Sequence, residues 1–160
     1  MTTTTNSGTI NIAVGHVLTI GTGLPSQFIN NGIVQDYGSL TVAADMSGTG
    51  SVVVWSGGIA SLKGMVGSGE ALKLHASAVL ALPDAHDFHG SVAMAVGSEI
   101  DVNFNVTSIG IASGMLTLNS QMGAEASFRL GGGAGIGNVA SFSQIHDGGG
   151  GTRIVFNPGH

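Results

Sequence analysis

The chain has 160 residues, which is enough for one domain built around one hydrophobic core. Charged residues make up only 8% of it, and nine acidic against four basic side chains give a net charge of -5. Nucleic-acid binding needs clustered Lys and Arg, so this balance argues against it, and the absence of cysteine excludes disulfides and thiolate chemistry.

Short segments in which apolar and small polar residues alternate recur along the whole chain. This period of two is typical of half-buried β-strands. In chain order, the segments are Thr9–Ile12, Val17–Ile20, Ser39–Val42, Ala71–Leu74, Met115–Leu118 and Thr152–Phe156. Gly-rich turn signals separate them, and no window shows the 3.6-residue period of a helix. We therefore expect an all-β protein with almost no helix.

Two all-β architectures fit many short strands with Gly-rich corners: an antiparallel sandwich or barrel, and a β-solenoid, or parallel β-helix. A sandwich core usually contains large aromatic residues, which are only 5% of this chain, whereas Val, Ile, Leu and Ala suit the narrow interior of a coil. The sequence therefore predicts one β-solenoid domain over residues 1–160, with a Thr-rich segment at 1–8 and coils over 9–157. Candidates for Asn ladders between coils are Asn30, Asn31, Asn103, Asn105 and Asn119.

Two parts of the sequence resemble known families. The segments Asn30–Val34, Gly38–Val42, Gly48–Val52 and Gly57–Leu62 resemble the β-helical repeats of bacterial autotransporter passengers and related filamentous adhesins. The C-terminal half is similar to a module of large exported proteins of alphaproteobacteria, through Leu80–Asp84, Phe88–Val92, Glu99–Val102, Gly114–Leu118 and Gly148–Ile154. The resemblance implies an exported coil of a kind that serves adhesins, matrix proteins and some enzymes alike.

The start of the sequence, Met1–Asn6, lacks the basic and apolar regions of a cleavable signal peptide. No run reaches the ~18 consecutive apolar residues of a membrane span. The sequence also lacks the C-terminal membrane β-barrel that is typical of autotransporters. We therefore expect an extracellular or cell-surface protein that is exported by a route resembling type I secretion.

One candidate metal site is the densest titratable cluster, formed by Asp84, His86, Asp87 and His89. Imidazole and carboxylate groups together suit Zn²⁺ or another divalent ion. On a strand, the two histidines would point to opposite faces, so they reach one ion only if this segment is a loop. The alternative is a solvated turn.

A second candidate site involves the acidic residues beside Gly-rich turns, where carboxylates and main-chain carbonyls can gather around Ca²⁺. These residues are Asp36, Asp45, Asp101 and Asp147. The alternative is that each of these carboxylates bonds its own backbone, as Asp in such turns usually does.

Three aromatic residues could stack on sugar rings if they face outward: Phe28, Tyr37 and Trp55. Trp55 also follows three consecutive valines and could close the core instead. A polysaccharide lyase or tailspike-like hydrolase needs paired carboxylates in a cleft, whereas the acidic residues here are spread singly. We predict no enzymatic activity, and a monomeric adhesin or carbohydrate-binding module and a β-helical polysaccharide enzyme stay as alternatives.

The ends of a solenoid are exposed strand edges that natural proteins cover with caps, and this sequence shows no strong cap. We expect the N-terminal strand with Ile10 and Ile12 to dock on the C-terminal strand with Ile154, Val155 and Phe156 of the next copy. Such a head-to-tail contact generates an open filament. The predicted function is that of a secreted structural protein whose partner is itself, in filaments or a biofilm matrix, in contact with polysaccharide or a cell surface.

Overall fold

The computed structural model describes residues 1–23, 25–131 and 138–159, and it is built almost entirely of β-strands. The strands of the coil are β1 (Thr2–Asn6), β2 (Thr9–Ile12), β3 (Val17–Ile20), β4 (Ser26–Asn30), β5 (Ile33–Asp36), β6 (Ser39–Val42), β7 (Asp45–Ser47), β8 (Ser51–Val54), β9 (Ile59–Leu62), β10 (Ala71–Leu74), β11 (Val79–Leu82), β12 (Ser91–Met94) and β13 (Glu99–Val102). After them come β14 (Ser108–Ala112), β15 (Met115–Ser120), β16 (Gly123–Leu130), β17 (Phe142–His146) and β18 (Thr152–Phe156), and the 3₁₀ helices are η1 (Ala85–Asp87) and η2 (Val139–Ser141). All six strands predicted from the sequence are confirmed.

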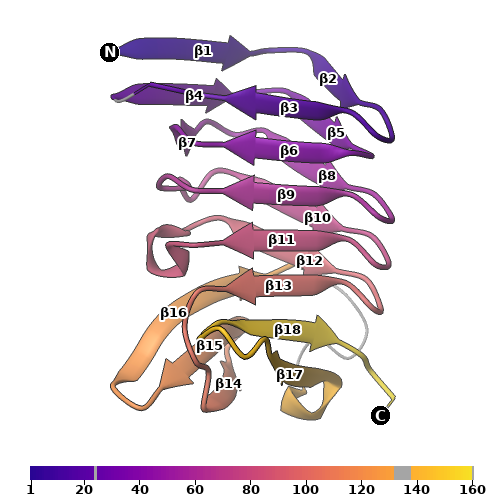
Figure 1. Ribbon diagram of the computed structural model, residues 1–160, viewed down its shortest axis with the longest axis vertical. Helices are drawn as coiled ribbons and strands as arrows, with labels where there is room; N and C mark the ends of the chain where they lie inside the picture. The colour runs from indigo at the N-terminus through magenta and orange to yellow at the C-terminus, as the bar shows by residue number, and fades with distance from the viewer. Residues whose placement is uncertain (24, 132–137, 160) are drawn as a thin grey trace.

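The chain winds through about five turns of a three-sided coil (Figure 1). Face A contains β1, β4 and β7, face B runs from β2 through β5, β8 and β10 to β12, and face C runs from β3 through β6, β9 and β11 to β13. Every strand pair between successive turns of the coil is parallel. This arrangement confirms the predicted β-solenoid.

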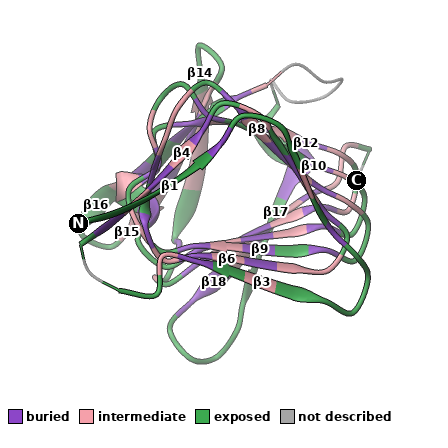
Figure 2. Ribbon diagram, turned by 90° about the horizontal axis from the view of Figure 1, so that it is seen from above, coloured by how far each residue is buried: buried purple, intermediate pink, exposed green. Residues whose placement is uncertain are grey.

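The core is a set of columns in which equivalent side chains of successive turns stack inside the coil. Figure 2 shows buried residues on the strands around the coil. The columns form because alternation along each short strand sends every second side chain inward. Their central members are Phe28, Met46, Val66 and Phe88 on face A, Val34, Val52, Leu72 and Val92 on face B, and Leu40, Ala60, Leu80 and Ile100 on face C. All twelve are at most 2% exposed, so the interior is dry and close-packed.

The corner before each strand of face B is a further column, and four of its five members are glycine: Gly8, Gly32, Gly50, Glu70 and Gly90. A Cβ atom on Gly32 would collide with the carbonyl oxygen of Gly8 in the turn above. A Cβ atom on Gly50 would meet both the Gly32 carbonyl and the Asn30 amide. Glycine is therefore required at positions 32 and 50 by the close approach of two turns.

The lower end of the coil is covered by antiparallel strands. β18 pairs with β13, β17 pairs with β18, and β14, β15 and β16 form a meander whose last strand joins β12. Phe128 of β16 lies edge-on against Phe88, with ring centroids 5.6 Å apart. The parallel pairs between successive turns thus extend to β13, which ends at Val102, and most of the later strand pairs are antiparallel. The alternation of residue types is the same in parallel and antiparallel strands, so it could not show this change.

We expect Gly32→Ala to lower the free energy of unfolding by about 2 to 3 kcal/mol, since it overpacks the corner between two turns. Gly8→Ala is the matched control, because a Cβ atom there meets nothing within 4 Å. Urea unfolding at low protein concentration measures both changes. Equal stability of the two variants would contradict the role assigned to this column.

Candidate functional site

The first turn of the coil has unpaired strand edges on all three faces. Among the described residues, β1 pairs only with β4, β2 only with β5, and β3 only with β6. The carbonyls of Gly8 and Ile12 accept hydrogen bonds from the backbone N–H groups of Ile33 and Tyr37 in the second turn. Because backbone groups alternate in direction along a strand, those of Thr9 and Asn11 point to the open side. We call β1, β2 and β3 together the N-terminal rung. It is a ready template for another chain.

The interior columns also end exposed at the N-terminal rung. Thr4 begins the column that continues to Phe28, and it is exposed. Ile10 and Leu18 are only partly buried, whereas their partners in the second turn, on β5 and β6, are fully buried. Docking another strand layer on this end would remove these side chains from water.

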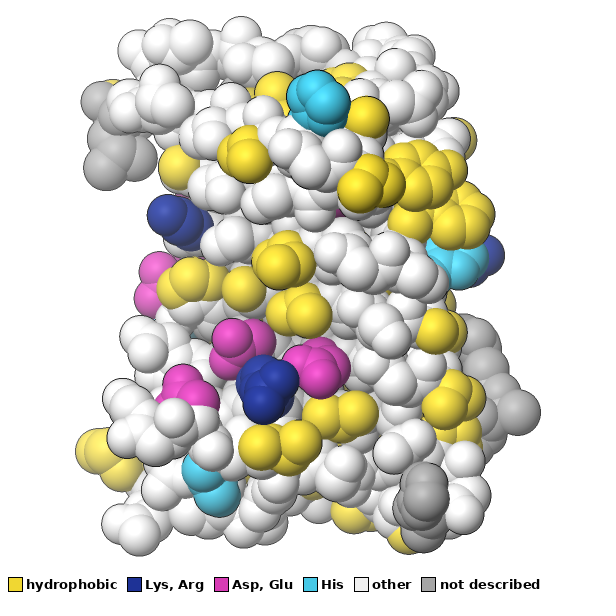
Figure 3. Space-filling model, turned by 45° about the vertical axis from the view of Figure 1, so that its right-hand side comes forward, with side chains coloured by type: hydrophobic (Ala, Val, Ile, Leu, Met, Phe, Trp, Pro, Cys, Tyr) yellow, Lys and Arg dark blue, Asp and Glu magenta, His cyan; other side chains and the backbone are white. Residues whose placement is uncertain are grey.

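The N-terminal rung carries no protective charge. The first charged side chain of the sequence is Asp36, which lies beyond the whole first turn. In Figure 3 the upper part of the molecule accordingly shows neither dark blue nor magenta side chains. Natural edge strands usually carry Lys or another charge that prevents pairing between copies, and this rung has none.

The predicted partner of this rung, the strand with Ile154, Val155 and Phe156, is not a free edge. This strand, β18, lies between β13 and β17 and is hydrogen-bonded to both. Ile154 and Phe156 are buried in the core, and Val155 faces outward on face C. The part of the predicted interface formed by these three residues is therefore unavailable for strand pairing, whereas Ile10 and Ile12 do lie on an open edge.

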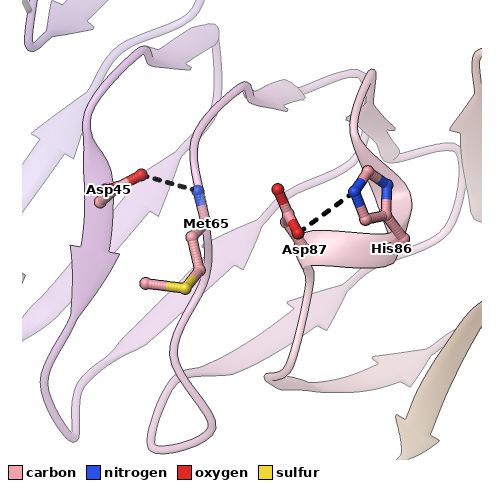
Figure 4. Close-up of polar contacts among 4 residues, drawn as sticks. All are labelled: Asp45, Met65, His86 and Asp87. Atoms are coloured by element: carbon pink, nitrogen blue, oxygen red, sulfur yellow. Dashed lines mark hydrogen bonds and ion pairs between the residues drawn. The ribbon is translucent and has the colours of Figure 1, made fainter.

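The predicted metal cluster is spread around the turn that contains η1. His86 and Asp87 form an ion pair, with Nε2 and Oδ1 3.3 Å apart, and both are largely exposed (Figure 4). Asp84 and His89 are exposed on either side of this pair. No group of three or more His, Asp or Glu side chains arranged for a metal occurs in the described ranges. The four side chains therefore lie on an exposed turn, and a metal site there stays a prediction.

The four acidic residues considered for Ca²⁺ lie in different places. Asp36 points into the coil, and Asp45 accepts a hydrogen bond from the Met65 backbone of the next turn at 3.0 Å (Figure 4). Asp101 and Asp147 line one shallow hollow of about 200 Å³ at the lower end.

The carboxylate of Asp147 bonds its own loop. It accepts backbone hydrogen bonds from Gly149 and Gly151 at 2.7 and 3.0 Å, and these bonds lower its pKa. Burial raises the pKa of Asp101, and the charge of Asp147 adds to this effect. Of the four residues, Asp101 and Asp147 therefore lie close together. The Asp147 carboxylate bonds its own backbone, which was the alternative to a Ca²⁺ site.

An aromatic ladder follows the corner between faces B and C. Tyr37 stacks on Trp55 with ring centroids 5.2 Å apart, and Trp55 stacks on His75 at 4.0 Å. These residues come from three successive turns, and Figure 3 shows hydrophobic side chains beside a histidine along this corner. Phe28, the third aromatic residue considered for sugar stacking, is completely buried and cannot contact a ligand.

A buried polar spine runs down the coil at the corner between faces A and B. The Nδ2 group of Asn6 donates to Oδ1 of Asn30 at 2.9 Å, and Nδ2 of Asn30 donates to Oε2 of Glu70 at 3.0 Å. Asn30 confirms one predicted ladder position. Sequence analysis missed Glu70, although aligning the turns would have revealed it as the acidic member of the glycine column.

Burial strongly perturbs the pKa of the Glu70 carboxyl. Burial raises its pKa from 4.5 to about 7, although the hydrogen bond from Asn30 opposes the shift. Its Oε1 atom is buried and has no hydrogen-bond partner among the described residues. Burial also raises the pKa of Asp36, against hydrogen bonds from the Gly38 and Leu40 backbones.

Comparisons with known proteins add no family to these observations. No protein-family model matches the sequence, and no curated protein matches it significantly. Among the helices of the described residues, none has the length and apolar character needed to cross a membrane.

We expect the protein to be more stable at pH 5 than at pH 8. The folded state holds the Glu70 proton more tightly than the unfolded state, so this stability is full below pH 4.5 and is lost as the pH rises through about 7. The shift corresponds to about 3 kcal/mol. Urea unfolding across this pH range measures the effect.

Glu70→Gln is the matched control, because its amide oxygen still accepts from Asn30 but cannot ionise. We expect this variant to flatten the pH profile and to exceed the parent protein in stability at pH 8. An unchanged slope in the variant would assign the effect elsewhere, and Asp36→Asn would then test the other buried carboxyl.

Proposed function

We propose that this protein is a structural, non-enzymatic module that associates with itself through the N-terminal rung. The observation that carries the proposal is a complete turn of three open strand edges without any charged side chain. Each docked strand would form backbone hydrogen bonds and cover the exposed ends of the interior columns. Without charged side chains on the strands of the rung, local Coulomb repulsion between two copies is weak.

The roles of the acidic side chains support a structural function. Asp36 and Asp147 accept hydrogen bonds from nearby backbone groups, and Glu99 pairs with Arg153 at 3.2 Å. Glu70 belongs to the buried polar spine. Because these carboxylates already bond partners within the coil, they are poorly placed to act on a substrate.

We further propose that the protein works outside the cell, in a matrix or at a surface. A surface poor in charge and rich in Gly, Ser and Thr is compatible with a place in a matrix, and the resemblance to adhesin repeats points the same way. Export by a route resembling type I secretion belongs to this proposal. Polysaccharide or a cell surface would then surround the assembled protein.

A monomeric carbohydrate-binding adhesin is the second candidate function, and the aromatic ladder favours it. Tyr37 is partly exposed at the end of the ladder and could lie against a sugar ring. Sugar-dependent quenching of Trp55, the single tryptophan of the chain, together with a monomeric mass at all concentrations would support this function over self-association.

We expect Asn11→Pro to prevent self-association without unfolding the coil. The backbone N–H of Asn11 points to the open side, so proline removes a donor that only a docked strand would use. Asn11→Ala is the matched control, and light scattering after size exclusion over a range of concentrations measures the mass. Circular dichroism checks the fold.

A second variant, Ile10→Lys, introduces a charge into the same rung at a partly exposed position. Both variants should stay monomeric at concentrations where the parent protein and Asn11→Ala associate. A parent protein that is monomeric throughout, or folded variants that associate as the parent does, would overturn the proposal.

A further inference from the structure

The two ends of the coil offer different surfaces to a partner. The upper end is a three-sided rung of edges, whereas the free edges of the lower end, β14 and β17, belong to antiparallel strands on two faces only. The described chain therefore contains one three-sided rung. Its match in shape and hydrogen bonding is the same rung of a second copy.

We propose that two copies dock head-to-head through their N-terminal rungs, around a two-fold axis that runs between the two β2 strands. This inference rests on the proposed self-association and specifies its geometry. A two-fold axis perpendicular to the coil reverses the direction of winding, so every strand of one rung meets a strand of the other copy in antiparallel orientation. Antiparallel pairing satisfies the same backbone groups as parallel pairing does.

The pitch of the coil selects the strand that lies on the axis. One turn advances by one strand spacing, about 4.8 Å, so the first turn descends from β1 through β2 to β3 (Figure 1). If β2 faces β2 of the second copy, then β1 faces β3 of the second copy and β3 faces its β1. The descent of the strands along the coil axis in one molecule is then matched by the opposite descent in the other. All three gaps are then equal. With β1 or β3 on the axis, one contact would clash or another would stay open.

The residues of β2 suit a contact with their own copies. Thr9 and Asn11 turn their backbone groups to the open side, where Thr9 and Asn11 of the second copy lie. The inward side chains Ile10 and Ile12 then meet each other across the axis and continue the apolar column of face B. Cross-strand apolar pairs of this kind stabilise the pairing of two strands.

The pairing of β1 with β3 of the second copy is also compatible with the interior. Thr4 is already the strand partner of the buried Phe28 within its own chain, so a threonine at this position is compatible with an apolar neighbour. In the docked pair it would lie beside Leu18 or Ile20 of the second copy in the same manner. The resulting contact is isologous and closed, so it forms a dimer and leaves both antiparallel ends pointing outward.

The cysteine-free chain allows a direct test with single cysteines. Asn11→Cys places an exposed thiol near the proposed axis, where the two copies bring their Cβ atoms within about 8 Å. Ser143→Cys places an exposed thiol on β17 at the opposite end and is the matched control. A short bis-maleimide is added to each variant and to their mixture, with a tag on one variant, and the products are identified by mass.

We expect Asn11→Cys to form cross-linked dimers of twice the 15.9 kDa chain mass, and we expect Ser143→Cys and the mixed pair to give only background. A dominant mixed product would show head-to-tail docking, which overturns this inference and leaves the proposed self-association standing. Absence of any cross-link, together with a monomeric mass of the parent protein at every concentration, would overturn both.

Discussion

The architecture depends on one constraint: the backbone N–H and C=O groups of a β-strand need partners on both of its edges. A coil meets this need along its length, because each turn supplies the partner edge for the next, and the parallel pairs between turns do so on all three faces. The same stacking brings equivalent side chains into columns and brings the corners so close that a residue such as Gly32 cannot carry a Cβ atom. Hydrogen bonding, core packing and the glycine column are thus consequences of one repeat distance.

The constraint fails at the two ends, and the chain treats them differently. At the lower end, β18 turns back against β13, and Phe128 of the meander covers the aromatic end of the face A column. At the upper end, the edges of β1, β2 and β3 stay open. A protein with one covered end has one open end for strand pairing with a second copy. This favours a finite assembly over an indefinitely growing one.

Local pattern predicted much of this structure, and contacts distant in sequence account for what it missed. Thr9–Ile12 and Ala71–Leu74 were identified correctly because their alternation reports burial of one face. The same alternation in Thr152–Phe156 carries no information on strand direction, so its antiparallel return was not foreseen. The inward orientation of Phe28 depends on its register with Met46, and Glu70 is exceptional only when compared with the glycines of other turns.

The buried polar spine connects the interior to the open end. Asn6 closes the corner between β1 and β2, since its Oδ1 accepts from the Gly8 backbone at 3.1 Å while its Nδ2 donates to Asn30. The relative positions of β1 and β2 are therefore fixed before any partner arrives. Preorganisation of this kind reduces the conformational entropy lost on docking, which matters for a surface that relies on backbone hydrogen bonds and a few apolar side chains. A polar group inside the coil would thus support the proposed docking surface at its end.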